Sequence, residues 1–260
     1  MSSDNKSTLE CRQLTVDVPG RLLVRELNLQ LGQGAFVAVL GQNGAGKSLT
    51  LHTLAGLRAP AAGRIFLQGL DLHAMRRKDI ACQLALLPQL SDDAFPATVF
   101  DTALSGRHPH VPALQWEGAR DRDIALACLQ RMDLAELRDR DVATLSGGER
   151  RRLAIAQTLA QQPQVYLLDE PTNHLDPQHQ LDVLNEFRRE TAAGNTVLAS
   201  LHDVNLAVRY ATDCLLLFGD GRWEFGPAKS VLRSDTLSAL YATPIEPVPW
   251  RDTTLFFASG

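Results

Sequence analysis

The 260-residue sequence lacks several features that mark particular classes of protein. It has few cysteines, and they are scattered without the paired spacing of a disulfide framework or a zinc site, so we expect reduced thiols in a cytosolic protein. No apolar run approaches the roughly 20 residues that cross a bilayer. The polar start MSSDNKSTLE is unlike a secretory signal. We therefore expect a chain that does not itself span a membrane.

A surplus of basic charge is also missing. The sequence has 26 Lys and Arg against 30 Asp and Glu, a net charge of -4, which gives no general attraction to nucleic acid or anionic lipid. It has no low-complexity linker and no internal repeat. A hydrophobic content of 45% and a charged content of 22% are those of an ordinary soluble globular protein. The length allows one large domain with a full core, or two small domains.

Three nearly continuous apolar runs are present instead: AFVAVLG (35–41), VYLLDE (165–170) and TVLASLH (196–202). Such runs are typical of strands buried on both faces in a parallel sheet. The segments between them have helical periodicity, which predicts an α/β fold. Near the N-terminus, the alternation of LNLQL (27–31) and the run GRIFLQG (63–69) predict a smaller antiparallel sheet.

Charged and apolar residues at helical spacing, without a strand signal, fill residues 118–144. We expect a helical insertion over roughly 89–158 within one domain that covers the whole chain. Residues 1–88 and 159–260 then form the sheet-containing core and the β-subdomain. The proline-rich segment TPIEPVPW (243–250) predicts an extended or polyproline-like tail, and no function is assigned to it.

A phosphate-binding motif follows the first apolar run. GQNGAGKS matches G-x-x-x-x-G-K-[ST], and its position between an expected strand and a helical pattern argues against a chance glycine turn. The glycines let backbone N–H groups point into one concavity, Lys47 neutralises phosphate charge, and Ser48 ligates Mg²⁺. The residues expected to bind the nucleotide here are Gly41, Gln42, Asn43, Gly44, Ala45, Gly46, Lys47, Ser48 and Leu49.

Reactive side chains follow the other two apolar runs, at the edge where open α/β sheets bind ligands. Asp169 is expected to hold Mg²⁺ through water. Glu170 is expected to accept a proton from the attacking water or to orient it. His202 would reach the γ-phosphate as a hydrogen-bond donor. The alternatives are structural: paired or capping carboxylates, and a histidine satisfied by its neighbours.

A second anion-binding layout appears in LSGGERRRLAIAQ (145–157), where a Ser-Gly-Gly turn leads into a helix. N–H groups at a helix N-terminus lack intrahelical partners and carry partial positive charge. Together the motifs resemble those of the nucleotide-binding subunits of ABC (ATP-binding cassette) transporters, over almost the whole chain. LSGGE is similar to the signature motif of that family.

This resemblance implies a P-loop NTPase fold, with a RecA-like core, an N-terminal antiparallel β-subdomain and a helical subdomain. It also implies an ATPase that uses ATP and Mg²⁺. Cassettes of the family dimerise head to tail, so that the signature of one chain closes on the ATP of the other. Ser146, Gly147 and Gly148 would then contact the ATP held by the partner. Gln89, in LLPQL, resembles the Q-loop glutamine, which senses the γ-phosphate and Mg²⁺.

Two further positions matter for the nucleotide. Asp176, in NHLDP, resembles the D-loop aspartate that acts across the dimer, but Asp176-Pro177 is equally a good start for a helix. Many cassettes stack an aromatic residue of the first strand on adenine. Here the corresponding position is Val18, and no aromatic residue lies between Met1 and Ala35. Weaker apolar contact to the base is therefore expected.

Two other clusters have simpler interpretations. His108 and His110 lie close together, but two histidines without further ligands rarely form a metal site. Arg150, Arg151 and Arg152 are expected to form a solvated or partner-facing edge of the signature helix rather than a nucleic-acid patch.

Two classes of cassette compete: the energy-coupling subunit of a transporter, and a soluble ATPase that acts on DNA or ribosomes. One complete cassette without a heptad run or basic surplus favours the transporter. With no span fused to it, the membrane permease would be a separate chain, contacted near Gln89 and residues 90–110.

The segment LLPQLSDDAFPATVFDTALSGRHPH (86–110) resembles importers of ferric siderophores, haem and vitamin B12. We therefore expect a bacterial importer subunit for a metal chelate or cobalamin. It would form a homodimer at the cytoplasmic face of the inner membrane, with a periplasmic substrate-binding protein as indirect partner and no nucleic acid. A common ancestor with a different cargo is the alternative.

Overall fold

The computed structural model describes residues 7–89 and 96–259. Its strands are β1 (Leu9–Val18), β2 (Arg21–Leu31), β3 (Phe36–Leu40), β4 (Ala62–Leu67), β5 (Leu70–Asp71), β6 (Leu84–Leu87), β7 (Val165–Leu168), β8 (Thr196–Ser200), β9 (Asp213–Leu217), β10 (Trp223–Pro227), β11 (Ile245–Trp250) and β12 (Thr253–Ala258). Its α-helices are α1 (Lys47–Leu54), α2 (Arg77–Ala81), α3 (Val99–Ser105), α4 (Ala119–Arg131), α5 (Gly147–Ala160), α6 (Pro177–Ala192), α7 (Val204–Tyr210), α8 (Ala228–Val231) and α9 (Ser234–Tyr241). Short 3₁₀ helices occupy Leu72–Ala74, His108–His110, Ala135–Leu137 and Val142–Thr144. Among the helices of these ranges, none is long and apolar enough to cross a bilayer.

The central sheet has the strand order β10-β9-β3-β8-β7-β6, and its neighbours are parallel except for β10 against β9. Its strands β3, β7 and β8 are the three apolar runs of the sequence. On β3, Phe36 and Ala38 face one hydrophobic core while Val37 and Val39 face the other. Both faces are covered, which explains why the runs are nearly continuously apolar. The predicted α/β class with a mostly parallel sheet is confirmed.

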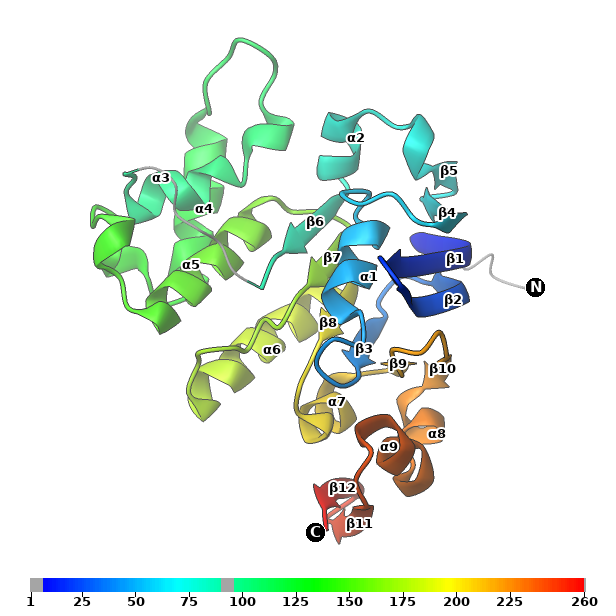
Figure 1. The fold of residues 1–260 in the computed structure, drawn as a ribbon. Helices are drawn as coiled ribbons and strands as arrows, with labels where there is room; N and C mark the ends of the chain where they lie inside the picture. The colour runs from blue at the N-terminus through cyan, green and yellow to red at the C-terminus, as the bar shows by residue number, and fades with distance from the viewer. Residues whose placement is uncertain (1–6, 90–95, 260) are drawn as a thin grey trace, which may run out of the picture.

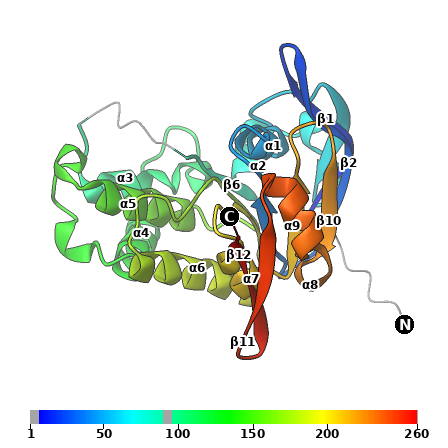
Figure 2. The same cartoon turned by 60° about the horizontal axis from the view of Figure 1, so that its bottom comes forward.

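A second sheet, of order β2-β1-β4-β5, is antiparallel throughout, as the N-terminal alternation predicted. It shares one core with α1 and one face of the central sheet. Residues of α3 to α9 form the other core against the opposite face. Figures 1 and 2 show this arrangement, with the antiparallel sheet on one side of the molecule and the layer of α3, α4 and α5 on the other.

Every described element between β6 and β7 is helical. Ala103 of α3, Leu129 of α4 and Ile155 of α5 are fully buried in the same core. The chain leaves the sheet at β6 and returns at β7, and these two strands are paired neighbours. A helical subdomain over roughly 89–158 stays a prediction, and residues 90–95 lie outside the described ranges.

The proline-rich tail is extended, as expected, but it is not an isolated polyproline segment. β11 pairs antiparallel with β12, from Ile245 opposite Ala258 to Trp250 opposite Thr253. This hairpin was not predicted from the sequence, because the prolines at 247 and 249 are unusual in a paired strand. In a two-stranded ribbon each strand has an open edge, so a residue without an N–H group is accommodated there.

Candidate active site

The glycine motif forms the loop between β3 and α1. Gly44 and Gly46 have φ angles of 76° and 100°, a region that residues with a Cβ rarely adopt. A Cβ on Gly41 would lie 2.4 Å from the carbonyl oxygen of Leu217. The N-cap of α1 is Gly46, which has no side chain to bond the first N–H groups of the helix. No capping side chain therefore competes with an anion for those groups.

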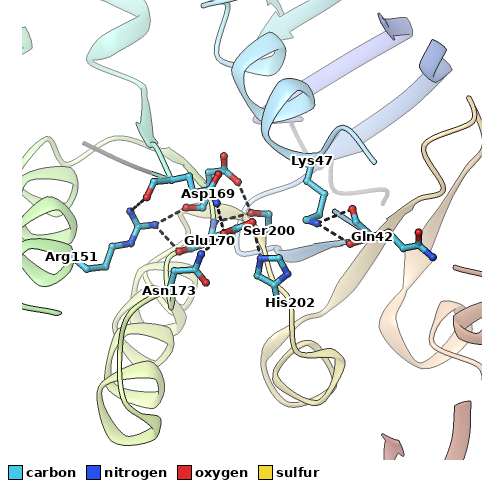
Figure 3. Close-up of polar contacts among 10 residues, drawn as sticks. Gln42, Lys47, Arg151, Asp169, Glu170, Asn173, Ser200 and His202 are labelled. Carbon is cyan, nitrogen blue, oxygen red and sulfur yellow. Dashed lines mark hydrogen bonds and ion pairs between the residues drawn. The ribbon is translucent and has the colours of Figure 1, made fainter. Parts of the chain in front are cut away.

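Lys47 lies back over this loop. Its Nζ donates to the carbonyl oxygens of Gly41 at 2.8 Å and Gln42 at 3.2 Å (Figure 3). Burial lowers the pKa of the Lys47 ammonium, whereas the carboxylates of Glu170 and Asp169 raise it. A phosphate oxygen is a stronger acceptor than a backbone carbonyl because it is charged, so an incoming phosphate would compete for this ammonium group.

Asp169 and Glu170 follow β7 and are both buried. The hydroxyl of Ser200, at the end of the neighbouring strand β8, donates to Oδ1 of Asp169 at 2.7 Å. The same Ser200 oxygen accepts a hydrogen bond from the Glu170 backbone N–H at 2.8 Å. One side chain thus holds both acidic residues. Ser200 was not predicted as a site residue, although it is a polar residue at the end of an apolar run.

Three side chains contact the carboxylate of Glu170 (Figure 3). Nε2 of Gln89 donates to its Oε2 at 2.7 Å, and Nε2 of His202 lies 2.7 Å from its Oε1. The amide of Asn173 also donates to Oε2. The structure therefore brings together Gln89, Glu170 and His202, which follow three adjacent strands. Asn173 was not predicted, and His202 contacts this carboxylate, so its role toward a phosphate stays a prediction.

A cavity of about 260 Å³ joins the glycine loop to these residues. It is lined by Asn43, Gly44, Gly46, Lys47, Ser48, Leu49, Gln89 and Glu170. A larger cavity of about 720 Å³ lies beside the C-terminal hairpin and is lined by none of the predicted site residues. The smaller cavity has the phosphate-binding loop and the carboxylate. The residues that line the smaller cavity therefore identify it as the candidate site, although the other cavity is larger.

The signature residues lie outside this cavity. Ser146 is the exposed N-cap of α5: its hydroxyl accepts from the Glu149 N–H at 3.3 Å, and the Glu149 carboxylate accepts from the Ser146 N–H at 2.7 Å. These bonds form a capping box and lower the pKa of Glu149. Ser146, Gly147 and Gly148 are not among the residues that line the 260 Å³ cavity. Their contact with the ATP of a partner stays a prediction.

Asp176 caps α6, as the structural alternative proposed. Its Oδ1 accepts from the His179 N–H at 2.9 Å, and this bond lowers the pKa of the carboxyl group. The proposed action of Asp176 across a dimer is not tested by this contact.

Val18 ends β1 and is partly buried. Arg21, which is paired with Val18, has a guanidinium nitrogen 3.9 Å from where a Cβ on Gly44 would lie, so the β1–β2 turn is beside the loop.

The prediction for the arginine run is wrong at Arg151. Its side chain is buried and donates to backbone carbonyls of the segments after β6 and β7. Arg152 donates to the Met132 carbonyl at 3.0 Å, and Arg150 to the Ala143 carbonyl at 2.7 Å. A helix presents consecutive residues about 100° apart, so three adjacent arginines cannot share one face.

His108 and His110 have separate partners. His108 lies 3.0 Å from Glu117, and His110 contacts the Gln161 carbonyl at 2.7 Å. Across 7–89 and 96–259, no group of three or more His, Cys, Asp or Glu residues is placed to hold a metal ion. The cysteines are free, and burial raises the pKa of the Cys11 and Cys214 thiols to about 12.

Comparison with known proteins identifies similar chains. The sequence model of the ABC transporter family matches residues 24–173. The hemin import ATP-binding protein HmuV of Gloeobacter violaceus is 42% identical over 221 residues, which cover 82% of this chain and 79% of the relative. The cobalamin import ATP-binding protein BtuD of Halobacterium salinarum is 37% identical over 90% of this chain and 58% of its own length.

Among solved structures, a putative metal-chelate type ABC transporter in an inward-facing conformation is similar in fold. The two chains superpose with a TM-score of 0.84 at 29% identity, and the match covers 98% of each. The similarity includes both sheets and the helical layer, because nearly the whole chain is aligned.

Proposed function

Because this chain belongs to the ABC transporter family, whose ATP-binding subunits hydrolyse ATP to drive transport, we propose that it energises an importer of a metal chelate or cobalamin. The chain binds ATP and works with a separate membrane permease. The observation that carries the proposal is the cavity that joins the glycine loop to Glu170, with Gln89 in contact with that carboxylate. The cargo classes, ferric siderophore, haem and cobalamin, are proposed from the similar proteins and the segment 86–110.

In the proposed reaction, the glycine loop binds the phosphates through backbone N–H groups and Lys47. Ser48 and Gln89 would hold Mg²⁺ through hydroxyl and amide oxygens, and the Asp169 carboxylate would hold it through water, since Mg²⁺ prefers oxygen ligands and keeps several waters. When bound, Mg²⁺ neutralises the charge that develops on the phosphates. Glu170 orients the attacking water and accepts its proton.

His202 and Ser200 support this carboxylate from the next strand. His202 contacts Oε1 of Glu170 at 2.7 Å and, with ATP bound, donates to the γ-phosphate instead. Ser200 holds the Glu170 backbone through its hydroxyl. The general base is therefore fixed at its backbone and free to exchange partners at its side chain, which a hydrolytic cycle needs.

Two copies of the chain form the complete ATPase. Ser146, Gly147 and Gly148 of one copy close on the γ-phosphate held by the other, and Asp176 acts across the same interface. The support for this arrangement is that these signature residues are exposed or partly exposed at the N-terminus of a 14-residue helix and lie outside their own chain's cavity. ATP then favours the closed dimer by its differential affinity for closed and open states.

The permease docks near Gln89 and residues 96–110, so that closure of the dimer moves the membrane domains. The part of this segment at 90–95 lies outside the described residues. In this assembly the chain is a peripheral protein at the cytoplasmic face of the inner membrane. A periplasmic substrate-binding protein delivers the cargo on the other side.

A pull-down tests the assembly. Tagged Glu170→Gln protein is recovered from detergent-solubilised membranes with ATP and Mg²⁺, and its partners are identified by mass spectrometry. The expected partner is a multi-span permease, with a periplasmic binding protein captured beside it. The same preparation without ATP is the control. Recovery of ribosomal proteins or DNA-binding factors, with no membrane chain, would overturn the importer in favour of a soluble ATPase.

A further inference from the structure

Arg151 has an unusual set of partners for a side chain on a helix. It lies one turn into α5, beyond the signature residues, and is only 5% exposed. All three of its guanidinium nitrogens donate to backbone carbonyls, and Figure 3 shows the bonds to Asp169 and Glu170. The acceptors are Pro88 at 2.7 Å, Gln89 at 3.2 Å, Asp169 at 2.6 Å, Glu170 at 2.7 Å and Pro171 at 3.3 Å. A guanidinium group has five N–H bonds, so each carbonyl is matched by one of them.

These carbonyls belong to two segments on neighbouring strands. One segment directly follows β6 and contains Gln89, and the other follows β7 and contains Glu170. The β6–β7 ladder ends at the pair Leu87 and Leu168, extended by one bond from the Asp169 N–H to the Leu87 carbonyl. Beyond that point the backbone ladder no longer sets the distance between the two segments. The guanidinium group of Arg151 connects the two segments beyond the end of the ladder, through its hydrogen bonds to both.

Arg151 keeps its positive charge at neutral pH, although its burial disfavours that charge. Burial lowers the pKa of the guanidinium to about 10, while the buried carboxylates of Asp169 and Glu170 oppose this change. The side chain therefore remains a cation at neutral pH and lies beside the two acidic residues of the site. Removing the guanidinium would leave the buried carbonyls of Asp169 and Pro171 without this donor, whereas the Glu170 carbonyl would keep the Asn173 N–H.

We infer that Arg151 is a positioning residue for ATP hydrolysis: it holds Gln89 and Glu170 in register and ties both to the helix that begins with the signature residues. This inference rests on the proposed function. Its consequence is that α5 serves two sites at once, because the N-terminus of α5 meets the partner's ATP while Arg151 sets the geometry around the ATP of its own chain. A displacement of α5 would therefore shift the segment that contains Gln89 and the segment that contains Glu170 together.

Kinetics of two substitutions test this role. Arg151→Lys keeps the charge but has one nitrogen, which cannot span both segments, and Arg151→Met removes charge and donors. For Arg151→Lys we expect kcat per folded molecule to fall on the order of 10²-fold, since misplacement of about 1 Å is that costly. The Kd for ATP should stay at the wild-type value, because the glycine loop is untouched. For Arg151→Met we expect the larger loss of kcat. Arg152→Lys, on the next position of the same helix, is the matched control and should keep the wild-type kcat.

A second measurement separates positioning from a general effect on the helix. In a Glu170→Gln background, Arg151→Lys should still form ATP-dependent dimers on a size-exclusion column, because the signature residues remain in place. A lowered melting temperature with an unchanged kcat would overturn the inference, and so would loss of ATP-dependent dimers in the double variant. If the wild-type chain itself failed to hydrolyse ATP, the proposed function and this inference would fall together. Normal wild-type hydrolysis with an unimpaired Arg151→Lys would overturn the inference alone.

Discussion

The Nε2 atom of Gln89 donates to Oε2 of Glu170 at 2.7 Å, although the two residues are 81 positions apart in the chain. They meet because β6 and β7 are neighbouring parallel strands. In the proposed mechanism, Glu170 needs its carboxylate for the attacking water and Gln89 turns to the phosphate and Mg²⁺. Nucleotide binding would therefore break the hydrogen bond between Gln89 and Glu170. Each side chain would then contact the substrate, and the Glu170 carboxylate would be free to act as the base.

Replacing Glu170 by Gln removes the proposed base but keeps the shape of the side chain. We expect ATP hydrolysis to fall about 10²–10⁴-fold, the usual contribution of a positioned general base. ATP binding should remain, and closed ATP-bound dimers should accumulate. Phosphate release and size-exclusion chromatography measure the two effects. Undiminished turnover would exclude Glu170 as the base.

Lys47→Ala provides the contrast to this variant. Lys47 is the cation of the glycine loop, so its loss should weaken ATP affinity itself. We expect the Kd of a fluorescent ATP analogue to rise roughly tenfold or more, a change of about 1.4 kcal/mol. Wild-type affinity in Lys47→Ala would contradict the role given to its ammonium group.

Ser146→Arg tests the composite site. The larger side chain would obstruct the surface on which the partner's γ-phosphate is expected to lie, while its own chain's cavity stays intact. We expect normal ATP binding with hydrolysis reduced on the order of 10²-fold, as for loss of a group that stabilises transition-state charge. Since Ser146 also caps α5, Ser146→Asp is the stability control, because aspartate caps equally well. Wild-type hydrolysis by Ser146→Arg would rule out the contact across the dimer.

Ser200→Ala removes the hydroxyl shared by Asp169 and Glu170. It leaves the buried Glu170 N–H without its acceptor, so unfolding free energy should fall by about 1–3 kcal/mol. We also expect kcat to decrease about tenfold, since each 1.4 kcal/mol of lost transition-state stabilisation is a factor of about ten. Ser105→Ala in α3 is the control, because its hydroxyl bonds the Thr102 carbonyl within the helical layer. Equal kcat values for the two variants would contradict the role of Ser200.

The ion pair between Asp121 and the buried Arg107 should make stability depend on pH. The bond from Arg107, at 2.9 Å, holds the pKa of Asp121 below its ordinary value of 3.8. A lowered folded-state pKa stabilises the protein at pH values above the unfolded pKa, and this contribution is lost as pH falls through the folded pKa. Asp121→Asn should therefore reduce unfolding free energy by about 1–3 kcal/mol near neutral pH.

The difference in unfolding free energy between wild type and Asp121→Asn should be constant in the neutral range. It should shrink as pH falls below 3.8. Chemical denaturation at a series of pH values measures it. Asp139→Asn is the matched control, since Asp139 also pairs with an arginine but is 87% exposed, and such pairs contribute little. A difference that persists unchanged in acid would show that the charge of Asp121 is not the cause.

A feature of the site was predictable from the sequence when it depends on a regular pattern of neighbouring residues, and not when it depends on residues far apart in the chain or on an irregular turn. The strands before Gly41 and Asp169 are continuous apolar runs because both their faces are buried, and local pattern reveals them. Ser200 escaped prediction because its role depends on which strands are neighbours, and no local pattern gives the strand order. Asn173 escaped because it contacts Glu170, three residues before it, within an irregular turn. Each needs a contact between residues distant in the chain or in an irregular turn.

The partners of Arg151 were also not predictable from local sequence. A run of arginines at the start of a helix is usually a solvated edge, and Arg150 is exposed as that rule predicts. Arg151 is turned by about 100° from it, toward the sheet, where five carbonyls accept its donors. Those acceptors come from residues 88–89 and 169–171, so only the tertiary structure identifies the partner of this side chain.

The position of β3 also has a consequence for synthesis. β3 pairs on one side with β8, which starts at Thr196, and on the other with β9, which starts at Asp213. The ribosome makes β3 early, yet its two neighbours are made only in the last third of the chain. During translation the strand that leads into the glycine loop therefore waits with both edges open and no sheet around it. Pairings so distant in sequence close slowly, and exposed strands of this kind are prone to aggregate. A nascent chain of this protein is thus expected to need chaperone protection until about residue 217 has left the exit tunnel.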